Sequence, residues 1–81
     1  MAQVVPLNQV VPVADSPSPY FIKKMMKVLE RQGQIEPLQV HTIKDKFIVF
    51  HADPWGNETV FAARNLGWNT ILVTVTGKFE V

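Results

Sequence analysis

The stretch from Pro19 to Gln32 limits the possible folds of this chain more than any other segment. At about 100° per residue, its apolar side chains fall on one arc and its charged side chains on the other. The apolar arc consists of Phe21, Ile22, Met25, Met26, Val28 and Leu29. Ser18 is suited to the N-cap position, Pro19 to the first helical residue and Gly33 to the residue that ends a helix. We therefore predict an amphipathic helix that packs on a hydrophobic core.

Two adjacent strands are predicted after this helix. The segment from Leu38 to Ile43 partly alternates between apolar and polar side chains, as a strand with one buried face does. Lys44 to Lys46 then form a turn, and Phe47 to Phe50 is an apolar return strand. This pattern predicts a β-hairpin.

A second helix and a further strand are predicted nearer the C-terminus. After a loop from His51 to Gly56, Asn57 is suited to cap a helix that runs to Leu66 and that Gly67 ends. We expect Phe61 of this helix to be buried in the core. The β-branched run from Thr70 to Val75 predicts a strand.

Short β-branched segments open the chain, at Val4–Val5 and at Val10–Val13. Pro6 and Pro12 flank them. Because proline cannot donate a hydrogen bond to a strand ladder, both segments are predicted to lie at sheet edges or strand ends.

The composition predicts one folded domain over residues 1–81 and excludes several classes of function. Hydrophobic residues make up 47% of the chain, which favours a core over disorder. The absence of cysteine excludes disulfides, thiolate zinc sites and thiol nucleophiles, and two histidines are too few to suggest a metal cage. A net charge of +1 gives no overall attraction to nucleic acid or membranes. Without an apolar run of about 20 residues or a signal-like N-terminus, we expect a cytoplasmic protein with no membrane contact.

Two motifs carry a resemblance to a known family. The first runs from Gly33 to Val40 and reads GQIEPLQV; the second begins at Gly56 and continues through a short helix to Gly67 and a β-rich run. In order and spacing they resemble the ParB N-terminal domain, within the wider ParB/sulfiredoxin superfamily, whose members typically read G-x-x-Q-P-L-x-V and G-x-R-R-x-x-A-A-x-x-x-G. The resemblance covers roughly Val4 to Val75 and implies an α/β (α+β) fold, with two helices packed on a small mixed sheet.

The residues that carry chemistry in the family differ here. Glu58 and Thr59 stand where the resemblance implies arginines that contact phosphate. Arginine suits that task because its guanidinium binds phosphate oxygens in pairs, whereas glutamate repels them. By the same resemblance the sulfiredoxin reaction needs a cysteine, and this chain has none. ParB proteins continue into a helix-turn-helix domain, so we do not expect sequence-specific DNA recognition of the usual ParB kind from these residues.

A candidate anion site lies at Gly56 and Asn57, where a loop meets the second predicted helix. Backbone N–H groups and the positive end of a helix favour an anion such as a phosphate at such a point. The resemblance implies nucleotide phosphates in this region. Glu58 in the first turn opposes this, and the alternative is a capped loop that binds no ligand. We therefore expect no useful affinity for CTP or ATP, and no cofactor.

His51, Asp53 and Glu58 permit an enzymatic interpretation. They lie close together in the sequence, and a small metal-dependent nuclease or nucleotidase could use such side chains. Nothing in the sequence fixes them at the spacing of metal ligands, so surface or capping roles compete with this interpretation. Asp53 before Pro54 also suits the start of a turn. We therefore assign no metal site and no catalytic residue.

The first predicted helix carries the one basic stripe of the sequence. Lys23, Lys24, Lys27 and Arg31 form it, and only Glu30 interrupts it. Their spacing places the last three cations on one ridge. Such a ridge could neutralise the phosphates of a nucleic acid with salt-sensitive affinity. The competing interpretation is a solvated helix face.

Trp55 is a second candidate for contact with a ligand, because it lies in a polar loop between Pro54 and Gly56. Its ring could stack on a base or on a partner. The alternative is a lid over a small core.

Three functions remain open at this point. The first is a non-catalytic ParB-like module that binds DNA or a DNA-associated protein, as in plasmid partition, with a homodimer as a further expectation. The second is the metal-dependent nuclease or nucleotidase. The third is a phage- or plasmid-borne regulator that retains only the scaffold and acts through protein contacts.

Overall fold

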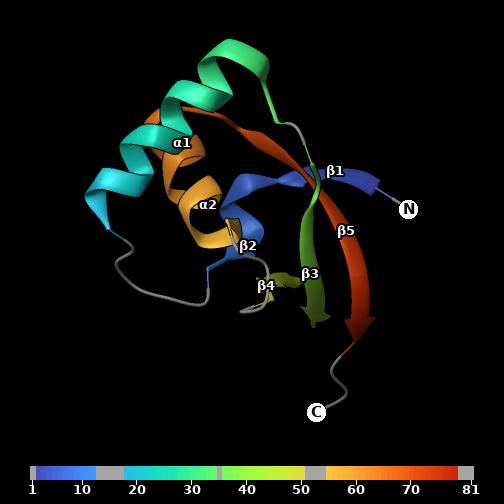
Figure 1. Ribbon diagram of the computed structural model, residues 1–81. Helices are drawn as coiled ribbons and strands as arrows, with labels where there is room; N and C mark the ends of the chain where they lie inside the picture. The colour runs from blue at the N-terminus through green and yellow to red at the C-terminus, as the bar shows by residue number, and fades with distance from the viewer. Residues whose placement is uncertain (1, 13–17, 35, 51–54, 79–81) are drawn as a thin grey trace.

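The computed structural model describes residues 2–12, 18–34, 36–50 and 55–78. These residues form the following elements: β1 (Ala2–Pro6), the 3-10 helix η1 (Leu7–Gln9), β2 (Val10–Val11), α1 (Pro19–Gln32), β3 (Leu38–Ile43), β4 (Lys46–Val49), α2 (Gly56–Asn65) and β5 (Thr70–Lys78). Figure 1 shows how they are arranged. The expected α+β fold, a small mixed sheet with two packed helices, is confirmed.

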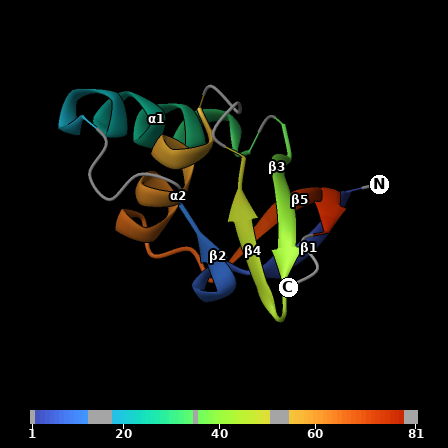
Figure 2. The ribbon, with the colours of Figure 1, turned by 90° about the horizontal axis from the view of Figure 1, so that it is seen from below.

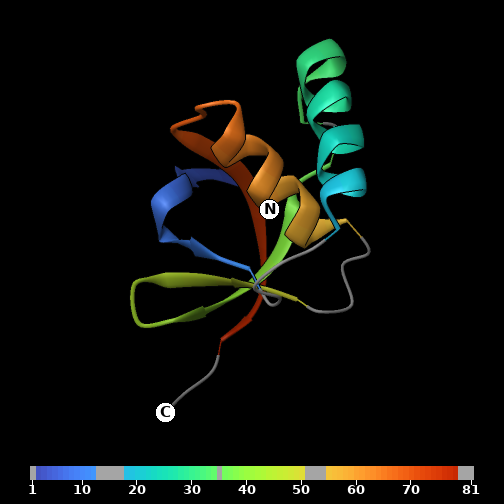
Figure 3. The same ribbon diagram turned by 90° about the vertical axis from the view of Figure 1, so that its left-hand side faces the viewer.

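The described strands form one mixed sheet in the order β1-β5-β3-β4-β2. The pairs β1/β5 and β3/β4 are antiparallel, whereas β3/β5 and β2/β4 are parallel. β1 and β2 lie at opposite ends of this order, although only η1 separates them in the chain. Because three residues span about 10 Å at most, the two edges of the sheet must approach each other. The sheet is therefore strongly curled, and both helices lie on the same side of it (Figures 2 and 3).

The N-terminal strands occupy the positions predicted from their prolines. Both β1 and β2 are edge strands; Pro6 ends β1 and Pro12 follows β2. The backbone N–H of Leu7 donates to the carbonyl of Asn69 over 2.9 Å, which ties η1 to the start of β5. β2 is shorter than predicted, and Val13 lies outside the described residues.

The predicted hairpin is confirmed, with shifted ends. β3 and β4 pair from Val40 opposite Val49 to Ile43 opposite Lys46. The return strand therefore begins one residue earlier than predicted and ends one residue earlier. β5 extends past Val75 to Lys78, because it continues to pair with β3 beyond a bulge in the register between Val40 and His41.

The hydrophobic core lies between the sheet and the helices. Its buried members are Val5, Leu7, Val10, Leu29, Leu38, Val40, Val49, Val60, Ala62, Ala63, Ile71 and Val73. The prediction that Phe61 belongs to this core is wrong. Phe61 is half-buried, and the Arg64 guanidinium carbon lies 5.6 Å from the centre of its ring. At 100° per residue, Phe61 falls on the side of α2 opposite Thr59 and Ala63, which are buried.

The side chain of Gln34 fixes the connection between α1 and β3. Its Nε2 donates to the carbonyl of Leu72 over 2.7 Å, and its Oε1 accepts from the Leu72 N–H over 2.8 Å. The amide thus pairs with β5 as a neighbouring strand would. Just before it, Gly33 ends α1 with a φ of 72°, and its N–H donates to the carbonyl of Leu29. This positive φ confirms the glycine predicted to end the helix.

Candidate nucleic-acid interface

The four cations of the predicted basic stripe lie together on α1 and are exposed: Lys23, Lys24, Lys27 and Arg31. We call them the basic face of α1. From Lys24 to Arg31 the helix rises about 10 Å, and over that distance one strand of B-form DNA carries roughly three phosphates. Within the described part of the chain, no ion pair holds any of these four side chains.

The opposite side of α1 holds the basic face in place. Leu29 is 4% exposed, and Ile22, Met25 and Met26 pack against the core. Ser18 occupies the N-cap position and Pro19 the first helical position, as predicted, although the Ser18 side chain makes no capping hydrogen bond. Because the inner side is anchored by packing, the orientation of the basic face follows from the fold.

Phe21 departs from the predicted apolar arc, since 39% of it is exposed. Its ring lies 5.3 Å from the ring of Tyr20 and 5.8 Å from that of Trp55, in edge-to-face geometry in both cases. The ammonium of Lys24 lies over the ring of Tyr20, 4.7 Å from its centre. These contacts join the basic face to a row of three aromatic side chains. The sequence shows the spacing of four between Tyr20 and Lys24, but not that Trp55 folds against Phe21.

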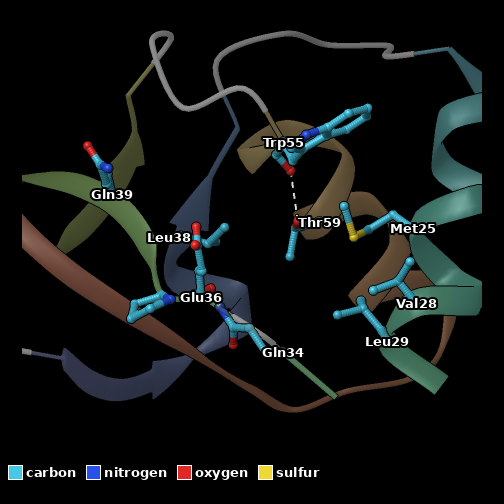
Figure 4. A pocket seen from close by; sticks show the side chains of 10 residues that line it. Met25, Val28, Leu29, Gln34, Glu36, Leu38, Gln39, Trp55 and Thr59 are labelled. Carbon is cyan, nitrogen blue, oxygen red and sulfur yellow. Dashed lines mark hydrogen bonds between the residues drawn. The ribbon is translucent and has the colours of Figure 1, made fainter. Parts of the chain in front are cut away.

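A cavity of about 240 Å³ lies between α1, the start of β3 and the start of α2 (Figure 4). Its lining consists of Met25, Val28, Leu29, Gln34, Glu36, Pro37, Leu38, Gln39, Trp55 and Thr59. Among these residues Glu36 is charged, and none is a cation. A phosphate in this cavity would therefore have no cationic side chain of the lining to neutralise it. Half of the apolar lining residues, Met25, Val28 and Leu29, come from α1.

The predicted anion site lies beside this cavity, in the first turn of α2. Gly56 is buried and Asn57 half-buried. The prediction that Asn57 caps the helix is wrong, because α2 begins at Gly56 with Trp55 at the N-cap position. Two hydrogen bonds explain why the helix begins earlier than predicted. The backbone N–H and the hydroxyl of Thr59 both donate to the Trp55 carbonyl, over 2.9 and 2.7 Å. Anion binding at this turn stays a prediction.

The residues at the two arginine positions of the family motif differ in their surroundings. Thr59 is 6% exposed, and its hydroxyl is held by the Trp55 carbonyl. Glu58 is half-buried in the first turn of α2. Its negative charge interacts favourably with the helix dipole there and repels a second anion. The first turn of α2 thus already carries one negative charge of its own.

Most of the acid–base group considered from the sequence lies outside the described residues. His51, Asp53 and Pro54 lie outside them, and Glu58 is the one member that the structure places. Within residues 2–12, 18–34, 36–50 and 55–78, no group of three or more His, Asp or Glu side chains could hold a metal ion.

This chain is similar to known proteins in structure but not in sequence. No family model matches the chain, and no curated protein matches it in sequence. Sulfiredoxin from Arabidopsis thaliana is similar in structure, with a TM-score of 0.78, 20% identity and coverage of 95% of this chain and 85% of that one. The chromosome-partitioning protein ParB from Caulobacter crescentus, complexed with CTP-γ-S, has a TM-score of 0.79 and 13% identity. Staphylococcus aureus SbnI has a TM-score of 0.75 and 17% identity.

These likenesses show that the chain has the ParB/sulfiredoxin fold, as its two motifs predicted. The match to ParB covers 99% of this chain but 46% of that one, and the match to SbnI covers 91% and 30%. The chain therefore spans less than half of either protein. As for membranes, no helix in the described part of the chain has the length and apolar character needed to cross a bilayer.

Proposed function

We propose that this chain is a non-catalytic ParB-like module that binds nucleic acid through the basic face of α1. The observation that carries the proposal is the joint exposure of four cations on the side of α1 opposite Leu29. Four cations and one anion, Glu30, give α1 a net charge of +3, whereas the whole chain carries +1. Positive charge is thus concentrated where a phosphate backbone can reach it.

The expected mode of binding is contact with phosphates. Lysine and arginine on an exposed helix face neutralise backbone charge without reading base edges, so the affinity should depend little on sequence and strongly on salt. The fold supports a DNA-associated setting, since one similar structure is ParB complexed to the centromeric parS site. We place the module in the cytoplasm, with DNA or a DNA-associated protein as partner. A homodimer would present two basic faces and bind more tightly through avidity; sedimentation with and without DNA tests this.

A heteronuclear NMR titration with a 12-base-pair duplex at low salt tests the proposal, with separate additions of CTP and Mg²⁺. We expect the amide shifts to change along α1 for the duplex and to stay unchanged along the β3–β4 turn. The absence of shifts along α1 on addition of the duplex would overturn the proposal, and shifts in the first turn of α2 on addition of CTP would show nucleotide binding there instead. Shifts around Glu58 on addition of Mg²⁺ would instead favour the nuclease or nucleotidase.

Two charge-matched variants separate the basic face from net charge. K24Q/K27Q removes two cations from α1, and K44Q/K46Q removes two exposed cations from the ends of the β3–β4 turn. By fluorescence anisotropy at low salt, we expect the first to weaken duplex binding about tenfold and the second less than about twofold. Equal weakening by both variants would show a general charge effect and would remove α1 as the site.

A further inference from the structure

The aromatic row beside the basic face, formed by Tyr20, Phe21 and Trp55, indicates which class of nucleic acid this module binds. Tyr20, Phe21 and Trp55 are 59%, 39% and 49% exposed, although large aromatic side chains are normally buried for stability. The other exposed large hydrophobic residues described are Val4 and Val11, both on edge strands. An exposed cluster of three adjoining rings is a usual sign of a binding surface.

The rings are held in place rather than freely mobile in solvent. Phe21 contacts Tyr20 on one side and Trp55 on the other, at interplanar angles of 70° and 64°. Edge-to-face contacts of this kind contribute about 0.5–1.5 kcal/mol beyond the area that they bury. The backbone of Trp55 is held at the start of α2, where its carbonyl accepts from Thr59. Ordering a base against these rings therefore costs little side-chain entropy.

One ring of the row, that of Tyr20, lies on the same ridge of α1 as three cations of the basic face. Tyr20, Lys24, Lys27 and Arg31 follow one another at spacings of four, three and four residues, so their side chains form one ridge. Lys24 joins the two parts, because its ammonium lies 4.7 Å from the centre of the Tyr20 ring. A strand whose phosphates follow the cations would bring its next bases to the aromatic rings.

We propose that Tyr20, Phe21 and Trp55 stack unpaired bases, so that the module binds single-stranded nucleic acid in preference to duplex. This inference rests on the proposed function, since the phosphates of the same strand lie on the basic face. In a duplex the bases are paired and stacked on each other, so the rings cannot reach their faces. Stacking on an aromatic side chain is worth about 1–3 kcal/mol per base and tolerates any sequence. The pairing of a cationic groove with aromatic platforms is typical of proteins that bind single strands.

Anisotropy with a labelled oligo(dT) of 12 nucleotides and with a 12-base-pair duplex tests the inference on the full chain. The variants Tyr20→Leu and Trp55→Leu keep an apolar side chain but remove the ring. We expect each to weaken oligo(dT) binding about five- to 150-fold, the equivalent of one lost stack, and to change duplex binding less than about twofold. Val4→Ala, at an exposed apolar position on β1, is the control and should change neither.

The fluorescence of Trp55 gives a second readout. In a Trp68→Phe background, Trp55 is the one tryptophan left, and we expect oligo(dT) to quench it while the duplex does not. If both ring variants leave oligo(dT) binding unchanged while K24Q/K27Q still weakens duplex binding, the stacking inference is wrong and the proposed function stands. If the parent chain binds neither probe at low salt, both are wrong. Equal losses for oligo(dT) and duplex in the ring variants would also overturn the preference for single strands.

Discussion

The outer side of α1 and the first turn of α2 differ in a way that bears on function. The outer side of α1 carries four exposed cations with an aromatic row beside them. The first turn of α2 carries Glu58 and the inward-pointing hydroxyl of Thr59, and none of the described residues that line the neighbouring cavity is a cation. Among the described residues, positive charge lies on an open helix surface rather than around this cavity. An open surface suits a long polyanion, and an enclosed cavity with cations would suit a small one.

The largest expected effect concerns the packing that holds the basic face. Leu29→Ala should lower the free energy of unfolding by about 2–5 kcal/mol, because it removes a large side chain that is buried to 96% against the core. Chemical denaturation followed by circular dichroism measures this. A variant that unfolds like the parent would show that α1 is not anchored through this side, and the basic face would lose its fixed orientation.

A second test asks whether the side chains at positions 58 and 59 alone prevent phosphate binding at the first turn of α2. The parent should show no binding of CTP or ATP in calorimetry, and E58R/T59R should gain measurable affinity. Two charge-assisted contacts would contribute about 3–6 kcal/mol before the cost of displacing the bound Thr59 hydroxyl. Micromolar binding of either nucleotide by the parent would contradict the contrast between the two regions.

A smaller effect separates the two sides of α2. Phe61→Ala should cost about 1 kcal/mol or less, because the ring is half-buried and contacts Arg64 rather than the core. Val60→Ala, the matched control on the buried side, should cost more. Denaturation of both variants measures the difference. If Phe61→Ala proves the more damaging of the two, the assignment of the faces of α2 is wrong.

Local patterns in the sequence account for most of the fold. The bounds of α1 were predicted correctly from its periodicity, its proline at the start and its glycine at the end. Each of these signals acts within a few residues. The same kind of signal predicted the β3–β4 hairpin, although its return strand lies one residue earlier than expected. By contrast, η1 is too short to show a period, and the side-chain pairing of Gln34 with Leu72 joins residues far apart in the chain.

The candidate interface also has one part that local sequence predicts and one part that depends on tertiary packing. The cations of α1 could be predicted from their spacing, because residues three and four apart share a helix face. The aromatic row could not, because Trp55 reaches Phe21 only after α1 and α2 have packed together. Asn57 was misplaced as a cap because capping preference is local, whereas the start of α2 is set by the pairing of Thr59 with Trp55.

The salt dependence of duplex binding tests the central claim most directly. The affinities of the parent chain and of K24Q/K27Q/R31Q would be measured by anisotropy over a range of salt concentrations. If the basic face binds phosphates, the parent should show a linear decrease of log affinity against log salt. The triple variant should fold normally, bind more weakly and show a slope shallower by up to about 2.7, the value for three phosphate contacts on B-form DNA. A triple variant that binds as tightly as the parent at every salt concentration would contradict the claim.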